Sequence, residues 1–102
     1  MEFKYDIQLL IEGKALDERA IHEHFAEVFK GDCLLVVGDE ELIKIHFHTN
    51  EPWKVLEYCA SLGEIYDIVI EDMERQAVRR MVRQAQKGQQ TSQKKKSKKR
   101  ER

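Results

Sequence analysis

The sequence has little proline, glycine or cysteine and no long apolar run. Of its 102 residues, one is proline, five are glycine and two are cysteine. The glycines form no phosphate-binding loop, because Gly38 stands alone and no Lys-Ser or Lys-Thr pair follows it. No apolar stretch approaches the roughly 20 residues of a membrane helix, and the first residues lack the basic and apolar regions of a signal peptide. We therefore expect a cytoplasmic protein in which Cys33 and Cys59 are reduced, buried thiols.

The small net charge of −1 hides an uneven distribution of charge. Residues 1–73 hold 6 Lys and Arg against 17 Asp and Glu, whereas residues 74–102 hold 12 against 2. The first part is thus strongly acidic and the second strongly basic. Such a division indicates an acidic folded body with a basic appendage.

Three segments in the first half have the composition of β-strands. Residues 3–12 and 42–50 alternate between apolar and polar side chains, as a strand with one buried face does. Residues 33–37 form a continuous apolar run whose length suits a strand. The acidic turn that follows this run predicts a hairpin into residues 42–50.

A fourth strand is predicted over residues 64–72. Simple alternation places Ile65 and Val69 on one face of this strand and Tyr66 and Ile70 on the other.

Three segments have helical spacing of apolar side chains. The first helix is predicted over residues 16–30, with Asp17 as its N-terminal cap and Gly31 as a left-handed C-terminal cap. The second is expected to follow Asn50 as its cap, with the single proline tolerated in its first turn. The third is an amphipathic helix over residues 74–87.

The predicted order is therefore β-α-β-β-α-β, followed by a helix and a tail. This order is that of the ferredoxin-like α+β fold, a four-stranded antiparallel sheet with two helices on one face. The first and third strands should form the central pair. We expect a ferredoxin-like domain over residues 1–73, a C-terminal amphipathic helix over 74–87 and a disordered basic tail over 88–102.

Two histidines could carry chemistry. His46 and His48 lie two positions apart on a predicted strand, so both point to the same face, about 6.6–6.8 Å apart at the backbone. Asp6, on the polar face of a neighbouring strand, could join them. Such a set suits zinc or another divalent metal and leaves an open fourth position. The alternative is that the histidines are simply exposed on the sheet, and we assign no catalytic residue because no general base is evident.

The remaining histidines and cysteines are given structural roles. His22 and His24 do not share a helix face and are expected to be solvated. Without a paired base, Cys33 and Cys59 are interpreted as core residues rather than nucleophiles.

One long stretch is specific enough to suggest a family. Residues 32–50 read DCLLVVGDEELIKIHFHTN, and this segment resembles the middle domain of bacterial fatty acid kinase A proteins, also called the dihydroxyacetone-kinase-related group. The resemblance covers roughly residues 3–76. Further similar segments are Glu51-Pro52, residues 55–58, Gly63-Glu64 and residues 70–73.

The resemblance implies a role in dimerisation and zinc binding, which the middle domain of that family has. It does not imply kinase activity, because the ATP-binding domain is a different part of those proteins; we expect a stand-alone relative. The family's metal site uses the two histidines, here His46 and His48, and a first-strand cysteine. Asp6 stands where that cysteine usually is, so a hard carboxylate would replace a soft thiolate.

The basic tail has several interpretations. Its cations could contact phosphates of nucleic acid or an anionic membrane surface. They could also merely solubilise the chain or be attracted to its acidic body. The candidate contact residues are Lys94, Lys95, Lys96, Lys98, Lys99 and Arg100.

Three functions follow as hypotheses. The first is a non-catalytic interaction module, a homodimer that could also bind a separate kinase or a fatty-acid-binding protein. The second is a metal-dependent enzyme using Asp6, His46 and His48. The third is nucleic-acid association through the tail.

Overall fold

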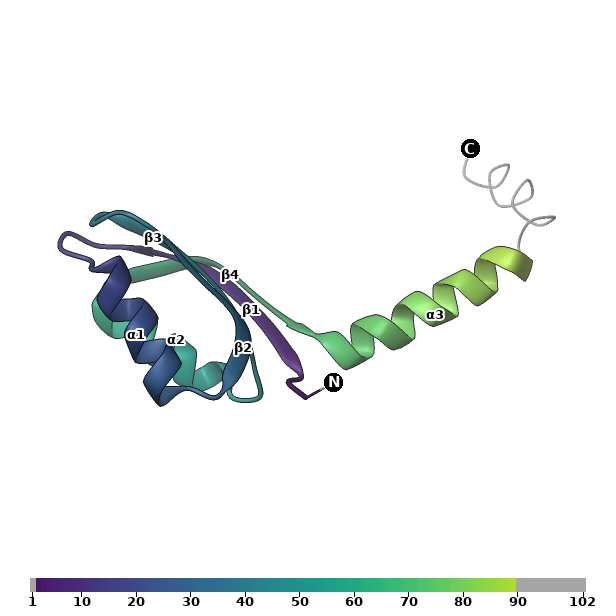
Figure 1. Cartoon of the computed structure of the whole chain (residues 1–102). Helices are drawn as coiled ribbons and strands as arrows, with labels where there is room; N and C mark the ends of the chain where they lie inside the picture. The colour runs from purple at the N-terminus through teal and green to yellow at the C-terminus, as the bar shows by residue number, and fades with distance from the viewer. Residues whose placement is uncertain (1, 90–102) are drawn as a thin grey trace, which may run out of the picture.

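The computed structural model describes residues 2–89 and has the predicted ferredoxin-like order of elements (Figure 1). The predicted basic cations from Lys94 to Arg100 lie outside the described residues. A helix extends the described chain beyond the α/β body. The elements are β1 (Tyr5–Glu12), α1 (Glu18–Val28), β2 (Gly31–Gly38), β3 (Leu42–Thr49), α2 (Pro52–Leu62), β4 (Glu64–Asp72) and α3 (Met73–Gln89).

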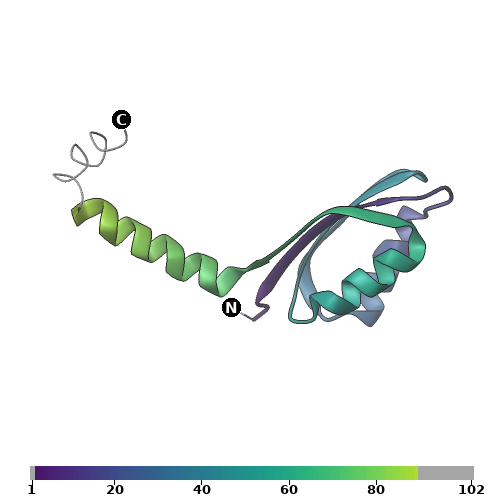
Figure 2. The ribbon, with the colours of Figure 1, turned by 180° about the vertical axis from the view of Figure 1, so that it is seen from behind.

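The four strands form one antiparallel sheet in the order β2-β3-β1-β4. The first and third strands are its central pair, as predicted. Helices α1 and α2 lie side by side against one face of the sheet (Figures 1 and 2). In the described part of the chain, no helix covers the other face, which we call the open face.

The core lies between the sheet and the two helices. The predicted alternation of β1 and β3 is confirmed, because their odd-numbered apolar side chains are buried. Phe25 of α1 is fully buried, and its ring meets those of Phe29, Phe47 and Tyr58 edge-to-face at centroid distances of 5.1–5.9 Å. The buried apolar side chains are Ile7, Leu9, Ile11, Ile21, Phe25, Ile43, Ile45, Phe47, Val55 and Cys59.

A bulge in β2 overturns one prediction. The pairing with β3 shifts between Asp32 and Leu35, and Cys33 adopts a left-handed backbone with φ +54°. The thiol of Cys33 is exposed rather than buried. The extra residue of the bulge removes Cys33 from the regular alternation, so a continuous apolar run could not reveal its position.

A second irregularity lies in β4. The register with β1 shifts between Gln8 and Leu10, and Asp67 has φ +52°. Tyr66 pairs with Leu10 and Val69 pairs with Gln8, so Tyr66 and Val69 lie on the same face of the sheet. The strict alternation predicted for this strand is therefore wrong in its middle.

Two predicted helix caps are also wrong. Asp17 does cap α1, accepting a hydrogen bond from the Ala20 amide at 3.1 Å, but Gly31 begins β2 instead of ending α1. A Cβ at Gly31 would collide with the carbonyl oxygen of His48, so glycine is required for the close approach of two strands. Asn50 does not cap α2; its side-chain oxygen accepts from the Lys4 amide at 2.8 Å.

Helix α3 continues directly from β4 and points away from the body (Figures 1 and 2). Asp72 caps it by accepting a hydrogen bond from the Arg75 amide at 3.0 Å, and this bond holds the pKa of the Asp72 carboxyl below its usual range. The apolar stripe of Val78, Met81 and Val82 is exposed. Among the described residues, no helix is long and apolar enough to cross a membrane.

Candidate metal centre

The sheet brings Asp6, His46 and His48 together on its open face. Asp6 of β1 pairs directly with His48 of β3, and His46 lies two positions earlier on the same strand. The intervening Phe47 points into the core, which fixes the two imidazoles outward. The strand alternation read from the sequence thus places all three predicted ligands correctly on one face.

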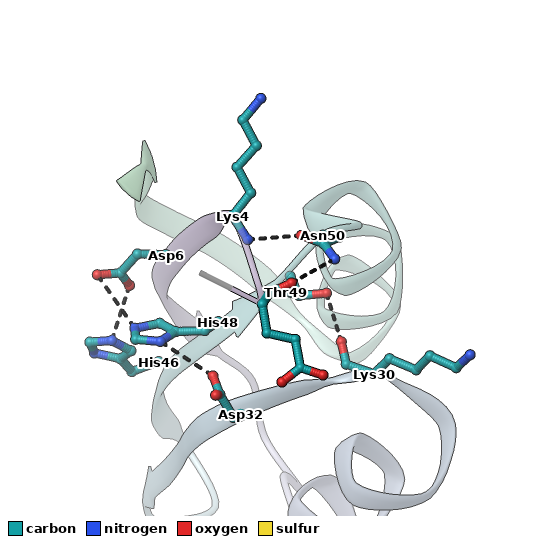
Figure 3. A network of polar contacts seen from close by, with 9 residues as sticks. Lys4, Asp6, Lys30, Asp32, His46, His48, Thr49 and Asn50 are labelled. Carbon is teal, nitrogen blue, oxygen red and sulfur yellow. Dashed lines mark hydrogen bonds and ion pairs between the residues drawn. The ribbon is translucent and has the colours of Figure 1, made fainter. Parts of the chain in front are cut away.

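The three side chains converge at short distances (Figure 3). Nε2 of His46 lies 3.0 Å from Oδ1 of Asp6, and Nε2 of His48 lies 3.9 Å from Oδ2 of the same carboxylate. One ligand atom from each residue lies within 4.8 Å of the others. All three side chains are partly buried, so the rest of the sheet limits their motion.

Oδ1 of Asp6 has an unusual environment. The atom is inaccessible to solvent and receives no hydrogen bond from the described residues. His46 approaches it at 3.0 Å without the alignment of a hydrogen bond. A buried carboxylate oxygen without a donor is costly unless a cation satisfies it. The arrangement therefore fits a divalent ion shared by the carboxylate and the imidazoles.

The chemistry of this ligand set is that of a small divalent metal centre. Two neutral imidazoles and one carboxylate suit zinc and also other first-row metals. Three protein ligands leave a coordination position free for water or for a group from a partner. A bound ion would act there as a Lewis acid or as a structural link.

Hydrogen bonds secure the end of the sheet beside the cluster (Figure 3). The buried Thr49 hydroxyl donates to the Lys30 carbonyl at 3.0 Å and accepts from the Glu51 amide at 3.1 Å. The Lys4 amide donates to Asn50 on the other side of the strand end. These contacts tie β1, β2 and β3 together next to His48, so the ligands are held on a rigid frame.

The structure adds two neighbours that were not predicted as ligands. Oδ1 of Asp32 lies 3.4 Å from Nδ1 of His48, and the exposed thiol of Cys33 lies in the same group. The only signal in the sequence is their position on a strand that pairs with the histidine strand. That signal is hidden, because the apolar run after Asp32 suggests a buried strand.

The other predicted roles have mixed outcomes. Cys59 is buried as predicted, and burial raises the pKa of its thiol to about 12. His24 is not simply solvated: it is half-buried and stacks on Tyr58 with ring centroids 3.8 Å apart. His22 is exposed, as predicted.

Exposed apolar side chains surround the cluster on the open face. The register places Leu35 opposite His46, Val37 opposite Lys44 and Val69 opposite Gln8. Each of these three aliphatic side chains is 45–46% exposed, and Leu42 of β3 is 42% exposed. An apolar surface around polar ligands is typical of an interaction site rather than of a purely solvated face.

The fold and the cluster together define a ferredoxin-like domain with a candidate His-His-Asp metal centre on its open face. Comparison with known proteins then identifies its family. The chain belongs to the FakA-like family of fatty acid kinase proteins, because residues 2–80 match the middle domain of that family.

Longer relatives occur in Staphylococcus aureus. Uncharacterized proteins of strains USA300, NCTC 8325 and N315 are each 38% identical to this chain over 73 residues. The matched segment covers 72% of this chain but only 13% of each relative. The similarity therefore concerns one domain of much longer proteins.

Proposed function

We propose that this chain is a non-catalytic interaction module that pairs with a second copy of itself through the open sheet face. The observation that carries the proposal is the open face itself. It presents aliphatic side chains that are nearly half exposed, although helices cover the opposite face and bury its apolar side chains. Pairing two such faces would remove the apolar surface from water.

A divalent ion, with zinc as the leading candidate, completes this proposal. Asp6, His46 and His48 would hold it at the same face, and its free position could accept a ligand from the second copy. Membership in the FakA-like family supports an assembly role, with a separate kinase or fatty-acid-binding chain as a further partner. A cytoplasmic location is part of the same proposal.

The pairing can be tested by sedimentation velocity. We expect the wild-type chain to sediment at twice its monomer mass of 12.1 kDa. Val69→Glu places a charge in the centre of the proposed interface and should yield monomers. Val28→Glu is the matched control, because Val28 is 58% exposed on α1, on the other side of the molecule. A wild-type monomer at high concentration, or equal dissociation of both variants, would contradict the proposal.

A metal-dependent enzyme is a second candidate. The observation that favours it is the set of only three ligands, which leaves a position where a bound water could be activated. A hydrolytic activity that zinc supports and His46→Ala abolishes would establish it. Activity that persists in His46→Ala would exclude the cluster as its source.

Nucleic-acid or anionic-membrane contact through the basic tail is retained as an independent proposal. It predicts steeply salt-dependent binding that disappears when residues 90–102 are removed. Unchanged binding after this deletion would refute it.

A further inference from the structure

His48 presents its two ring nitrogens to two different groups of ligands. Nε2 faces Asp6, whereas Nδ1 faces Asp32 on the opposite side of the ring (Figure 3). One atom each from Asp32, Cys33 and His48 lies within 4.8 Å of the others. The second group thus contains a carboxylate, a thiol and an imidazole, which are the three kinds of protein ligand that zinc uses.

The β2 bulge creates this second group. In a regular strand Asp32 and Cys33 would point to opposite faces, and only Asp32 could approach His48. The left-handed backbone of Cys33 and the shifted register bring its thiol to the same side. The device is local, since Asp32 still pairs with His48 in the sheet.

We propose that Asp32, Cys33 and Nδ1 of His48 form a second divalent-metal position, separate from the one made by Asp6 and Nε2 of His46 and His48. This proposal extends the proposed metal function, because both positions share His48. It does not depend on pairing of two copies. Its chemical preference is for zinc, because a thiolate is a softer ligand than the carboxylate of the first position.

The dimensions of the group are compatible with a small ion. Tetrahedral zinc places its nitrogen, oxygen and sulfur ligands about 3.3–3.6 Å apart, as follows from bond lengths of about 2.0–2.3 Å. The ligand atoms of the group lie within 4.8 Å, so they must close by about 1 Å. Asp32 and Cys33 are exposed and can rotate, while the half-buried His48 acts as the fixed ligand.

The charges of the two positions also complement each other. An ion at the second position is balanced by the Asp32 carboxylate and the Cys33 thiolate, whose thiol proton goes to solvent. The first position has only one anionic ligand, Asp6. When both are filled, His48 would lose its remaining ring proton to solvent and bridge the ions as an imidazolate, giving four negative ligands for two divalent ions.

Cobalt(II) provides a test that needs no enzymatic activity. The full chain, freed of metal by a chelator, is titrated with cobalt and its absorption spectrum is recorded. Only the second position contains sulfur, so a thiolate-to-cobalt charge-transfer band reports on it alone. We expect about two cobalt ions per wild-type chain and about one each in Cys33→Ser and His46→Ala. The band should be present in His46→Ala and absent in Cys33→Ser.

Thiol protection gives a second, independent readout. Cys59 is buried and serves as an internal control, so alkylation of the native chain by iodoacetamide should report on the exposed Cys33. Zinc at a hundredfold excess over its dissociation constant should slow this alkylation about a hundredfold, because only the free fraction reacts. Asp32→Asn should weaken the protection.

Two results would overturn the second position. One is the absence of both the charge-transfer band and the thiol protection in the wild-type chain. The other is loss of the band in His46→Ala, which would show that the sulfur belongs to a single centre with the first ligand set. Neither result bears on the sedimentation test of pairing, so the two proposals can fail separately.

Discussion

Zinc should stabilise the folded chain by an amount that the structure allows us to estimate. The ligands Asp6 and His46 are separated by 40 positions in the sequence but lie 3.0 Å apart in the sheet. They therefore come together only in the folded state, and an ion that binds them must favour folding. The experiment uses a Cys33→Ser background, which removes the thiolate of the second proposed position without disturbing the core.

The expected magnitude follows from mass action. Free zinc at a hundredfold excess over its dissociation constant stabilises the folded state by about 2.7 kcal/mol. For a domain of this size each kcal/mol raises the melting temperature by about 4–8 °C, so the total increase is about 11–22 °C. Weak binding of zinc to the unfolded His46-Phe47-His48 segment would reduce this value somewhat.

Thermal unfolding followed by circular dichroism, with and without zinc, measures this increase. His46→Ala in the same background should remove nearly all of it. His22→Ala is the matched control, because His22 is exposed on α1 and far from the sheet face, and it should leave the increase unchanged. A melting temperature that zinc does not raise, or that rises equally in His46→Ala, would refute the reasoning.

Three further predictions concern the frame that holds the site. Gly31→Ala should destabilise the fold by about 1–3 kcal/mol in urea unfolding, because its Cβ would collide with the neighbouring strand; wild-type stability would contradict the close strand approach. Phe25→Ala should cost about 3–5 kcal/mol in the same assay, since the ring is fully buried, and a loss below about 1 kcal/mol would contradict the packing. The carboxylate of Asp72 has a lowered pKa in the folded state, so its contribution is fully present above the usual value of 3.8 and is lost as the pH falls through the lowered value. Asp72→Asn keeps a capping side chain but should remove this part of the acid dependence of unfolding, and an unchanged pH profile would refute it.

The sequence is informative wherever apolar and polar side chains alternate. In β1 and β3 the alternation correctly separates Ile43 and Phe47 from His46 and His48, and it places Asp6 on the same face as the histidines. Right-handed connections between the elements then determine the order of the strands. The central part of the candidate site is therefore encoded by short-range periodicity.

The remainder could not be predicted because it depends on the two bulges. A bulge inserts one residue into a strand and exchanges the faces beyond it, and neither Cys33 nor Asp67 is a glycine that would mark such a place. The sequence pattern consequently predicts Cys33 in the core. It misassigns Gly31 for a related reason: glycine suits both a helix cap and a close strand contact, and only the tertiary structure decides between them.

The position of the ion is the most direct test of the account. Crystals of the wild-type chain grown with zinc can be measured on both sides of the zinc absorption edge. We predict an anomalous peak within about 2.0–2.2 Å of a carboxylate oxygen of Asp6 and of Nε2 of both His46 and His48. Well-ordered side chains at this cluster without anomalous density between them would contradict the central claim.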